Sequence, residues 1–209
     1  MSPTRLILLR HGQTPWNHEG RVQGQVDVEL DDTGHLQAAA AAPAIAAYRP
    51  EVLWSSDLAR ARQTAAYVAK ETGLEPVHDP RLREFFLGER QGLTHDEYAA
   101  RAPEEFVRFR AGDLSVALGG ESTTAVAARL EEALRELLDE IGPGGTGVAV
   151  AHGAAIRVAT LHLLGLPDSA HAAFRAVGNC HWVVLENHTG TIRLAGYNLA
   201  APEPVASGV

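Results

Sequence analysis

An arginine and a histidine stand next to each other near the start of the chain, directly after a short apolar run. The run is Leu6-Ile7-Leu8-Leu9, and Arg10-His11 follows it. Such a run is typical of a strand that is buried on both faces of a parallel sheet. Open α/β sheets bind ligands at the carboxyl ends of their strands. Because Arg supplies a permanent cation and His a nucleophile or base, the pair predicts a site for an anion, above all phosphate.

Three further polar residues follow predicted strands or the loops that lead from them, and they are Arg60, Glu84 and His152. Arg60 comes after the strand 51–54, and His152 comes directly after the strand 148–151. Since the carboxyl ends of parallel strands share one edge of a sheet, these side chains can converge with the first pair. Two arginines and two histidines would bind a phosphate dianion, and one carboxylic acid beside them could donate a proton.

Strand and helix patterns alternate along the chain, which predicts the framework for such a site. The expected strands are 5–9, 51–54, 76–79, 148–151, 181–186 and 191–194, and the expected helices are 33–48, 58–72, 122–141 and about 152–164. The repeated βα order predicts an α/β fold, a three-layer α/β/α sandwich whose central sheet is mostly parallel with an antiparallel edge.

The chain is expected to form one domain over residues 1–200, followed by a flexible tail at 201–209. Within the domain, about 80–120 is too long for an ordinary connection and is expected to be an insertion or lid, largely irregular apart from a short helix that begins at Thr94. A length of 209 residues, with 45% hydrophobic and 21% charged residues, suits a single well-buried domain.

Charge and cysteine content bound the partners and the compartment. The formal net charge of −8 disfavours nonspecific binding to nucleic acid or to anionic membranes. Cys180 is the single cysteine of the sequence, which fits a reducing cytosol, and the sequence shows neither a signal peptide pattern nor a membrane span. We therefore expect a cytoplasmic protein with no nucleic acid partner and no membrane partner. No paired cysteines and no His-x-x-x-His spacing occur, so neither a metal nor another cofactor is expected.

Four segments together resemble the histidine phosphatase superfamily, in its phosphoglycerate mutase-like branch. They are Arg10-His11-Gly12-Gln13-Thr14, the run 56–64 (SDLARARQT), Leu82-Arg83-Glu84 and His152-Gly153. The resemblance covers residues 5–198 and implies the phosphoglycerate mutase-like form of the three-layer fold. It also implies phosphoryl transfer without a metal.

The resemblance implies a role for each matching residue. His11 becomes the nucleophile that takes the phosphoryl group, and Glu84 becomes the acid that protonates the leaving oxygen. Arg10, Arg60 and His152 become phosphate ligands, and the planar paired donors of Arg suit the equatorial oxygens of the transferred group. Further contacts to substrate or phosphate are assigned to Asn17, Gln23, Gly24 and Gly153.

Some assignments have rivals in the sequence. Glu89 is the alternative to Glu84 as the acid, and Arg62 is the alternative to Arg60. The segment Gly119-Gly120-Glu121-Ser122 is either a helix N-cap or a polar wall of the site. Solvated or capping roles are expected for His35, His78, His95, His162, His171 and His188.

The residues after Glu84 favour a phosphatase over a mutase. Cofactor-dependent mutases continue with Arg-His-Tyr-Gly and hold the substrate carboxylate with basic residues of a longer insertion, whereas this chain continues with Phe85-Phe86-Leu87-Gly88. The arginines between 101 and 110 are interleaved with glutamates, as in a solvated helix. Mutase-type transfer remains an alternative, as does a non-catalytic phosphoester-binding module, which would need neither His11 nor Glu84.

The expected partner is a small phosphorylated metabolite. The segments 21–27, 91–95 and 178–182 are similar to glucosyl-3-phosphoglycerate phosphatases, which implies that substrate. Another sugar or organic acid phosphate, or α-ribazole phosphate, stays open as an alternative. A homodimer through the strand 181–186 or an edge helix is also left open.

Overall fold

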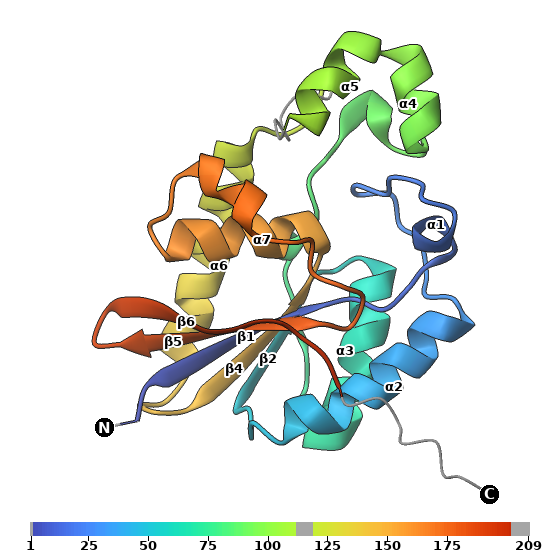
Figure 1. Cartoon of the computed structure of the whole chain (residues 1–209). Helices are drawn as coiled ribbons and strands as arrows, with labels where there is room; N and C mark the ends of the chain where they lie inside the picture. The colour runs from blue at the N-terminus through green and yellow to red at the C-terminus, as the bar shows by residue number, and fades with distance from the viewer. Residues whose placement is uncertain (1, 112–118, 202–209) are drawn as a thin grey trace, which may run out of the picture.

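A central sheet with the strand order β3-β2-β4-β1-β5-β6 organises the chain (Figure 1). The structure is a computed structural model that describes residues 2–111 and 119–201. The strands are β1 (Thr4–Arg10), β2 (Val52–Ser55), β3 (Val77–His78), β4 (Thr146–Ala151), β5 (Trp182–His188) and β6 (Thr191–Leu199). The tail expected at 201–209 lies outside the described residues, apart from residue 201.

Most of the sheet is parallel, as the βα order predicts. The pairs β1–β4, β2–β4 and β2–β3 are parallel, whereas β5 lies antiparallel to β1 and β6 lies antiparallel to β5. The last strand runs to Leu199, beyond its expected end at 194. Register shifts around Val184 mark a bulge in this pair, and a bulge breaks the alternation by which a strand is recognised in a sequence.

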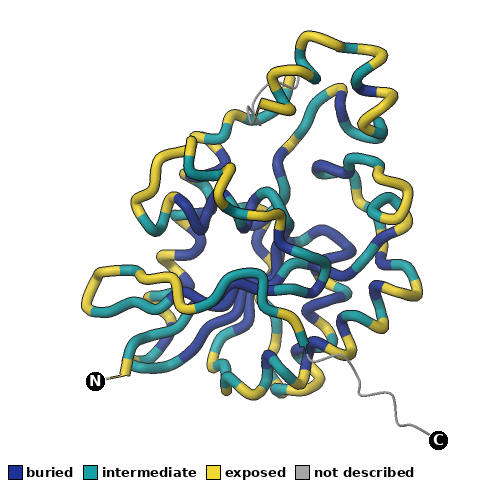
Figure 2. Tube along the Cα trace, viewed as in Figure 1, coloured by how far each residue is buried: buried dark blue, intermediate teal, exposed yellow. Residues whose placement is uncertain are grey.

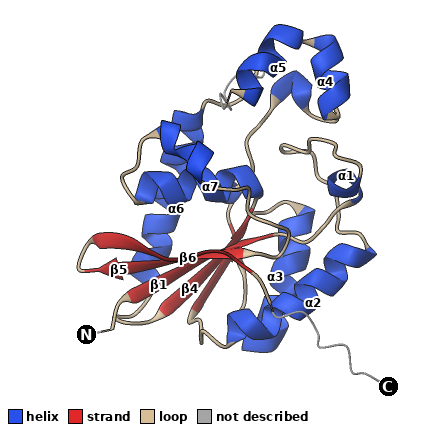
Figure 3. Cartoon of the chain, in the orientation of Figure 1, coloured by secondary structure: helices blue, strands red, loops and turns tan. Residues whose placement is uncertain are grey.

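Helices cover both faces of the sheet (Figure 3). The α-helices are α1 (Pro15–His18), α2 (Asp32–Ala46), α3 (Ala59–Thr72), α4 (His95–Arg101), α5 (Pro103–Arg110), α6 (Thr123–Glu140) and α7 (Gly153–Leu163). Short 3-10 helices are η1 (Pro80–Leu82), η2 (Gly88–Arg90) and η3 (Asp168–Ala173). None of the helices in the described ranges is long and apolar enough to cross a membrane.

The alternation of side chains along β1 divides the core into two layers. Ile7 and Leu9 pack with residues of α2 and α3, whereas Leu6 and Leu8 pack with residues of α6 and α7. All of these β1 side chains are at most 1% exposed, and the sheet is dark blue along its centre in Figure 2. This arrangement confirms the three-layer α/β/α sandwich, because a strand covered on both faces must be apolar on both.

Two glycines allow the loop after β1 to approach the start of α2. A Cβ on Gly34 would lie 2.0 Å from the carbonyl oxygen of Gln13, and a Cβ on Gly12 would lie 2.5 Å from the carbonyl oxygen of Gly34. The side chain of Asp31 caps the helix by accepting from the Gly34 N–H at 2.7 Å. Close backbone packing therefore fixes the loop that carries the residues after His11.

The segment between β3 and α6 is more regular than expected. The capping box predicted at Thr94 is present: its hydroxyl accepts from the Glu97 N–H at 3.2 Å and opens α4. A second helix, α5, follows directly with Pro103 in its first turn, and Tyr98 and Phe106 pack edge to face at 5.9 Å between the two helices. Figure 1 shows α4 and α5 as a hairpin that lies apart from the sheet, above the carboxyl ends of the strands.

Candidate active site

The carboxyl end of β1 and the amino-terminal ends of α3 and α7 border a cavity of about 320 Å³. Most of the residues predicted for the site line this cavity, and they are Arg10, His11, Asn17, Gln23, Gly24, Arg60, Glu84 and Gly153. His152 is not part of the lining, because it is fully buried behind His11. The two imidazole rings lie 5.1 Å apart between centroids.

Backbone pairing and one short hydrogen bond fix the orientation of His11. Its N–H donates to the carbonyl oxygen of Ala151 on β4 at 3.1 Å. Its Nδ1 lies 2.7 Å from the carbonyl oxygen of Gly12. A carbonyl oxygen can only accept, so this contact assigns the proton to Nδ1 and leaves the lone pair on Nε2. His11 therefore presents an imidazole in the tautomer that a nucleophile needs.

Burial and charge keep both histidines neutral. Desolvation is the main cause that holds the pKa of His11 well below its usual value of 6.5, and the cations of Arg60 and Arg10 add to it. Desolvation likewise lowers the pKa of His152. Its Nε2 lies 2.9 Å from the Ser56 hydroxyl, while its Nδ1 is buried without a partner in the protein.

The two arginines of the predicted phosphate site are anchored by neutral carbonyl groups. Arg10 donates to the Val177 carbonyl at 2.7 Å, and Arg60 donates to those of Val26 and Gly24 at 2.8 Å. Burial lowers the pKa of Arg60 to about 10, which leaves it charged at neutral pH. The Nε atoms of both arginines are buried and have no partner within the protein. Together with Nδ1 of His152, they are buried nitrogens near His11 without a protein partner, and a bound anion would satisfy the N–H groups among them.

Glu84 sits at the amino terminus of α7. Its Oε1 accepts from the N–H groups of Phe85 and Ala155 at 2.9 and 3.0 Å, and its Oε2 accepts from that of Ala154 at 3.0 Å. Free N–H groups and the helix dipole favour a carboxyl group at this position. The rival Glu89 lies outside the cavity lining and pairs with Arg101 at 2.7 Å on the surface.

An arginine of α6 clamps the backbone that carries Glu84. Arg129 donates to the carbonyl oxygens of Arg81, Arg83 and Glu84 at 2.8, 2.7 and 3.0 Å. Its remaining donors bind the carboxylate of Glu121 at 3.0 and 2.9 Å. That carboxylate accepts in turn from the Phe86 N–H at 2.8 Å. The loop is thus held on both sides of Glu84.

A bidentate ion pair joins two of the predicted motifs. The guanidinium of Arg83 donates to both carboxylate oxygens of Asp57 at 2.7 and 2.5 Å. The hydrogen bond from Arg83 is the main cause that lowers the pKa of Asp57. Fork-to-fork pairs of this kind set geometry as well as energy. The pair therefore fixes the loop Leu82-Arg83-Glu84 against the end of β2.

Arg62, the alternative to Arg60 as a phosphate ligand, is exposed on α3 and does not line the cavity.

The other residues that the sequence assigned to substrate or phosphate contacts differ in their surroundings. The Asn17 side chain accepts from the Thr14 N–H and from the Asn179 amide, both at 3.2 Å. Gln23 is 8% exposed and its Oε1 has no partner. Gly24 adopts a φ of +54°, and a Cβ on Gly153 would approach the Nε of Arg10 to 3.3 Å. Gly153 therefore leaves room for the guanidinium of Arg10, and Gly24 supplies a left-handed backbone conformation beside Gln91.

Several cavity residues were missed by the sequence analysis, and they are Arg21, Arg90, His95, Phe109 and Arg157. Of the apolar residues that follow Glu84 in place of the Arg-His-Tyr-Gly of the mutases, Phe85 and Leu87 line the cavity, but arginines from other positions reach it as well. Arg157 could have been found, since it follows Gly153 by one turn on the same helix face. No sequence signal distinguishes Arg90 from a surface arginine.

The structure places the motif at 119–122 at the start of α6. Ser122 caps α6 by accepting from the Ala125 N–H at 3.1 Å, and Glu121 binds Arg129 outside the cavity lining. The N-cap interpretation is therefore confirmed. Across residues 2–111 and 119–201, no group of three or more His, Cys, Asp or Glu residues could hold a metal ion.

The sequence profile of the histidine phosphatase superfamily (branch 1) matches residues 6–200. The chain belongs to this superfamily, and it is a hydrolase of the phosphatase class. It is 41% identical over 195 residues to glucosyl-3-phosphoglycerate phosphatase of Mycobacterium tuberculosis, covering 90% of this chain and 87% of that protein. A metal-independent phosphoserine phosphatase of Arabidopsis thaliana is 37% identical, over 77% of this chain and 68% of its own length.

Solved structures agree with this grouping. A mycobacterial glucosyl-3-phosphoglycerate phosphatase in complex with vanadate (VO3) superposes with a TM-score of 0.89 at 40% identity, covering 94% of this chain and 99% of that one. A phosphoserine phosphatase from Entamoeba histolytica in complex with phosphoserine gives a TM-score of 0.81 at 28% identity, over 93% of this chain and 96% of that one.

We predict that the free energy of unfolding decreases as the pH falls below 6.5, the usual pKa of His. The unfolded chain then takes up protons at positions 11 and 152 that the folded chain does not. The slope from each such group rises as the pH falls and approaches about 1.4 kcal/mol per pH unit near pH 5. His11→Ala should remove one such contribution, which urea unfolding at several pH values between 5 and 6.5 will measure as a smaller slope. Equal slopes for the two proteins would contradict the assignment of a neutral, buried His11.

The clamp on the Glu84 loop predicts that Arg129→Lys lowers kcat/KM for an alkyl phosphoester about 10- to 100-fold, since small displacements of a catalytic group have effects of this size. One ammonium group cannot bind three carbonyl oxygens and a carboxylate together. The matched control is Arg135→Lys on the same helix, which pairs with Glu131 on the exposed face. Equal losses in the two variants would show that the Arg129 contacts do not position Glu84.

Proposed function

We propose that this protein is a metal-independent phosphomonoesterase that acts through a phosphohistidine. The observation that carries this proposal is the arrangement around His11: a free Nε2 near the buried, unpaired side-chain nitrogens of Arg10, Arg60 and His152. N–H donors without protein partners are complementary to the three terminal oxygens of a phosphoryl group. A carboxyl group, that of Glu84, lines the same cavity.

In the first step, Nε2 of His11 attacks the phosphorus atom. The N–P bond forms while the P–O bond to the leaving group breaks, and Glu84 donates its proton to the departing oxygen. Charge on the equatorial oxygens is stabilised by the guanidinium groups of Arg10 and Arg60 and by the N–H of His152. The carbonyl of Gly12 stabilises the positive charge that develops on the imidazole, because it accepts from Nδ1.

In the second step, water attacks the phosphohistidine. Glu84, now a carboxylate, takes a proton from the water molecule, the N–P bond breaks, and inorganic phosphate leaves. The N–H groups of Ala154 and Ala155 stabilise this carboxylate between the two steps. One residue thus serves as acid and then as base, as microscopic reversibility requires.

We propose glucosyl-3-phosphoglycerate, or a closely related phosphorylated organic acid, as the substrate. This proposal is supported by relatives with that activity, which are 40–41% identical over 90% of this chain. Phosphoserine is the second candidate, because of the plant relative with 37% identity. The buried, free Cys180 is compatible with our proposal that the enzyme acts in the reducing cytoplasm.

His11→Ala should reduce turnover of p-nitrophenyl phosphate to below about 1% of wild type, since loss of a nucleophile costs several orders of magnitude. Assays are carried out with excess EDTA, which should leave the wild-type rate unchanged. Rapid quenching with a radioactive phosphoester should trap an acid-labile, base-stable label on the wild type but not on the variant. Label on the variant, or wild-type turnover that requires added metal, would refute this mechanism.

Glu84→Gln should slow hydrolysis of an alkyl phosphoester by roughly 10²- to 10⁴-fold and that of p-nitrophenyl phosphate much less, because nitrophenolate leaves without a proton. The Gln oxygen can keep the two bonds of Oε1, but its amide group would face the Ala154 N–H. Thermal unfolding is therefore measured in parallel to detect any structural cost. If both substrates slow equally, Glu84 is not the general acid.

A further inference from the structure

Two arginines in the cavity wall differ from the others there. Arg10, Arg21 and Arg60 donate to carbonyl or carboxylate oxygens of the protein. The side chains of Arg90 and Arg157 make no hydrogen bond and no ion pair with the residues that the structure describes, and both have a buried, unpaired Nε. An unpaired guanidinium in a cavity wall is costly unless an anion joins it.

Arg90 is 6% exposed and is held by aromatic rings only. Its guanidinium carbon lies 3.6 Å from the ring centroid of Phe109 on α5 and 5.0 Å from that of Tyr98 on α4. Burial lowers its pKa from the usual value of 12.5. Aromatic faces attract a cation but accept no conventional hydrogen bond, so they orient the planar group while leaving its N–H donors free.

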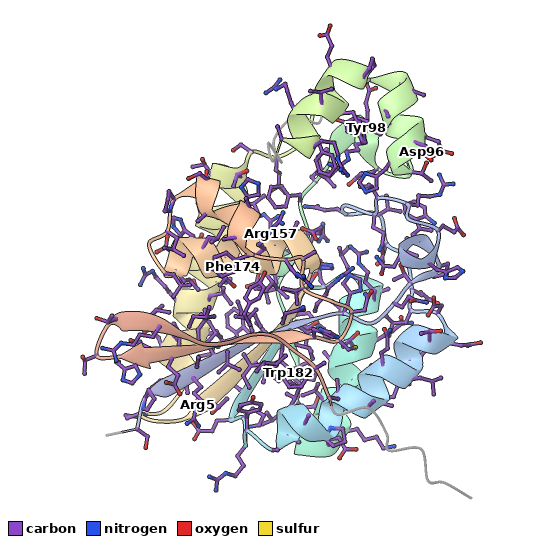
Figure 4. All side chains as sticks on the ribbon, viewed as in Figure 1. Arg5, Asp96, Tyr98, Arg157, Phe174 and Trp182 are labelled. Atoms are coloured by element: carbon purple, nitrogen blue, oxygen red, sulfur yellow. The ribbon has the colours of Figure 1, made fainter. Side chains whose placement is uncertain are left out.

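Arg157 approaches the cavity from a different element. It lies on α7 one turn after Gly153, and both residues line the cavity. Figure 4 shows Arg157 on α7 between the sheet and the α4–α5 hairpin, where Tyr98 is labelled. A cation on the helix and another below the hairpin therefore face one cavity, and they do not depend on each other for their positions.

The charged groups that line the cavity leave room for a second anion. A phosphate dianion is matched by Arg10 and Arg60, which lie beside His11. Among the described residues that line the cavity, Glu84 is the sole carboxylate, and backbone N–H groups bind it. Phosphate alone would therefore leave Arg90 and Arg157 without a counterion.

We propose that Arg90 and Arg157 form a second anion subsite that binds a carboxylate of the substrate, so that the enzyme selects phosphomonoesters that also carry a carboxylate. The planar fork of Arg matches the two oxygens of a carboxylate. The position of the subsite, between the phosphate site and the hairpin, places the selected group on the alcohol part of the ester. This inference rests on the proposed phosphatase activity and names the class of ester on which it acts.

The test compares substrates that differ in one carboxylate. The pairs are 3-phosphoglycerate with glycerol 3-phosphate, and phosphoserine with phosphoethanolamine. For the wild type we expect kcat/KM to be at least about tenfold higher for the carboxylated member of each pair, which corresponds to about 1.4 kcal/mol. Arg90→Met and Arg157→Met should each bring this ratio towards one, mainly through a higher KM for the carboxylated member.

Two further variants separate recognition from folding. Arg90→Lys keeps a charge but not the planar fork, so its ratio should lie between those of the wild type and Arg90→Met. Arg62→Met, on the exposed side of α3, is the matched control and should keep the wild-type ratio. Arg90→Met could disturb the hairpin, because Arg90 packs on Tyr98 and Phe109. Arg157 lies on α7, so a disturbed hairpin would not explain the same change of ratio in Arg157→Met.

The outcomes distinguish this inference from the proposed function. A wild-type ratio near one, or a ratio that both Met variants leave unchanged, would overturn the carboxylate subsite even if His11-dependent hydrolysis is intact. Equal loss of activity on both members of each pair would assign the two arginines a general role in place of a selective one and would also overturn it. Absence of hydrolysis of every phosphoester by the wild type would instead refute the phosphatase proposal.

Discussion

The parallel pairing of β1 with β4 is the constraint on which the active site depends. Arg10 lies opposite Ala151 in this register, so the chain leaves both strands at the same level and His11 and His152 meet at the sheet edge. A slip of one residue would exchange the faces of every side chain on β1 and bury Leu6 and Leu8 against the wrong helices. The packing of two apolar layers, from α2 and α3 on one side and α6 and α7 on the other, therefore fixes the geometry of the candidate site.

Around these strands, hydrogen bonds to backbone groups hold the polar side chains. Carbonyl oxygens anchor Arg10 and Arg60, and backbone N–H groups hold the Glu84 carboxyl group. Arg129 donates to carbonyl oxygens of the loop that carries Glu84. Backbone partners orient a charged group without neutralising it, in contrast to a salt bridge. The protein thereby keeps a concentrated positive charge in one cavity although its net charge is −8.

The sequence predicted the parts of the structure that arise from local pattern and from strand ends. Apolar runs located β1, β2 and β4, and the polar residues that follow them located His11, Arg60 and His152. The part that it missed depends on contacts between distant elements. Arg90 has the same local pattern as a solvated arginine, and only the fold of α4 and α5 brings Tyr98 and Phe109 to its faces. The clamp of Arg129 on the Glu84 loop is equally invisible, because its acceptors are carbonyl oxygens that any residue type supplies.

The attachment of the α4–α5 hairpin has a consequence for how such enzymes diverge. The hairpin itself meets the cavity through His95 and Phe109, and it packs on Arg90 of η2. The residues proposed to hold the phosphate come from the ends of β1 and β4, from α3 and from the loop of Glu84. Substitutions in the hairpin after a gene duplication can therefore alter the accepted alcohol without disturbing the reacting groups. A fold built in this way can evolve new specificities. Mutations in the peripheral α4–α5 hairpin can change the accepted substrate, while purifying selection preserves the residues around His11.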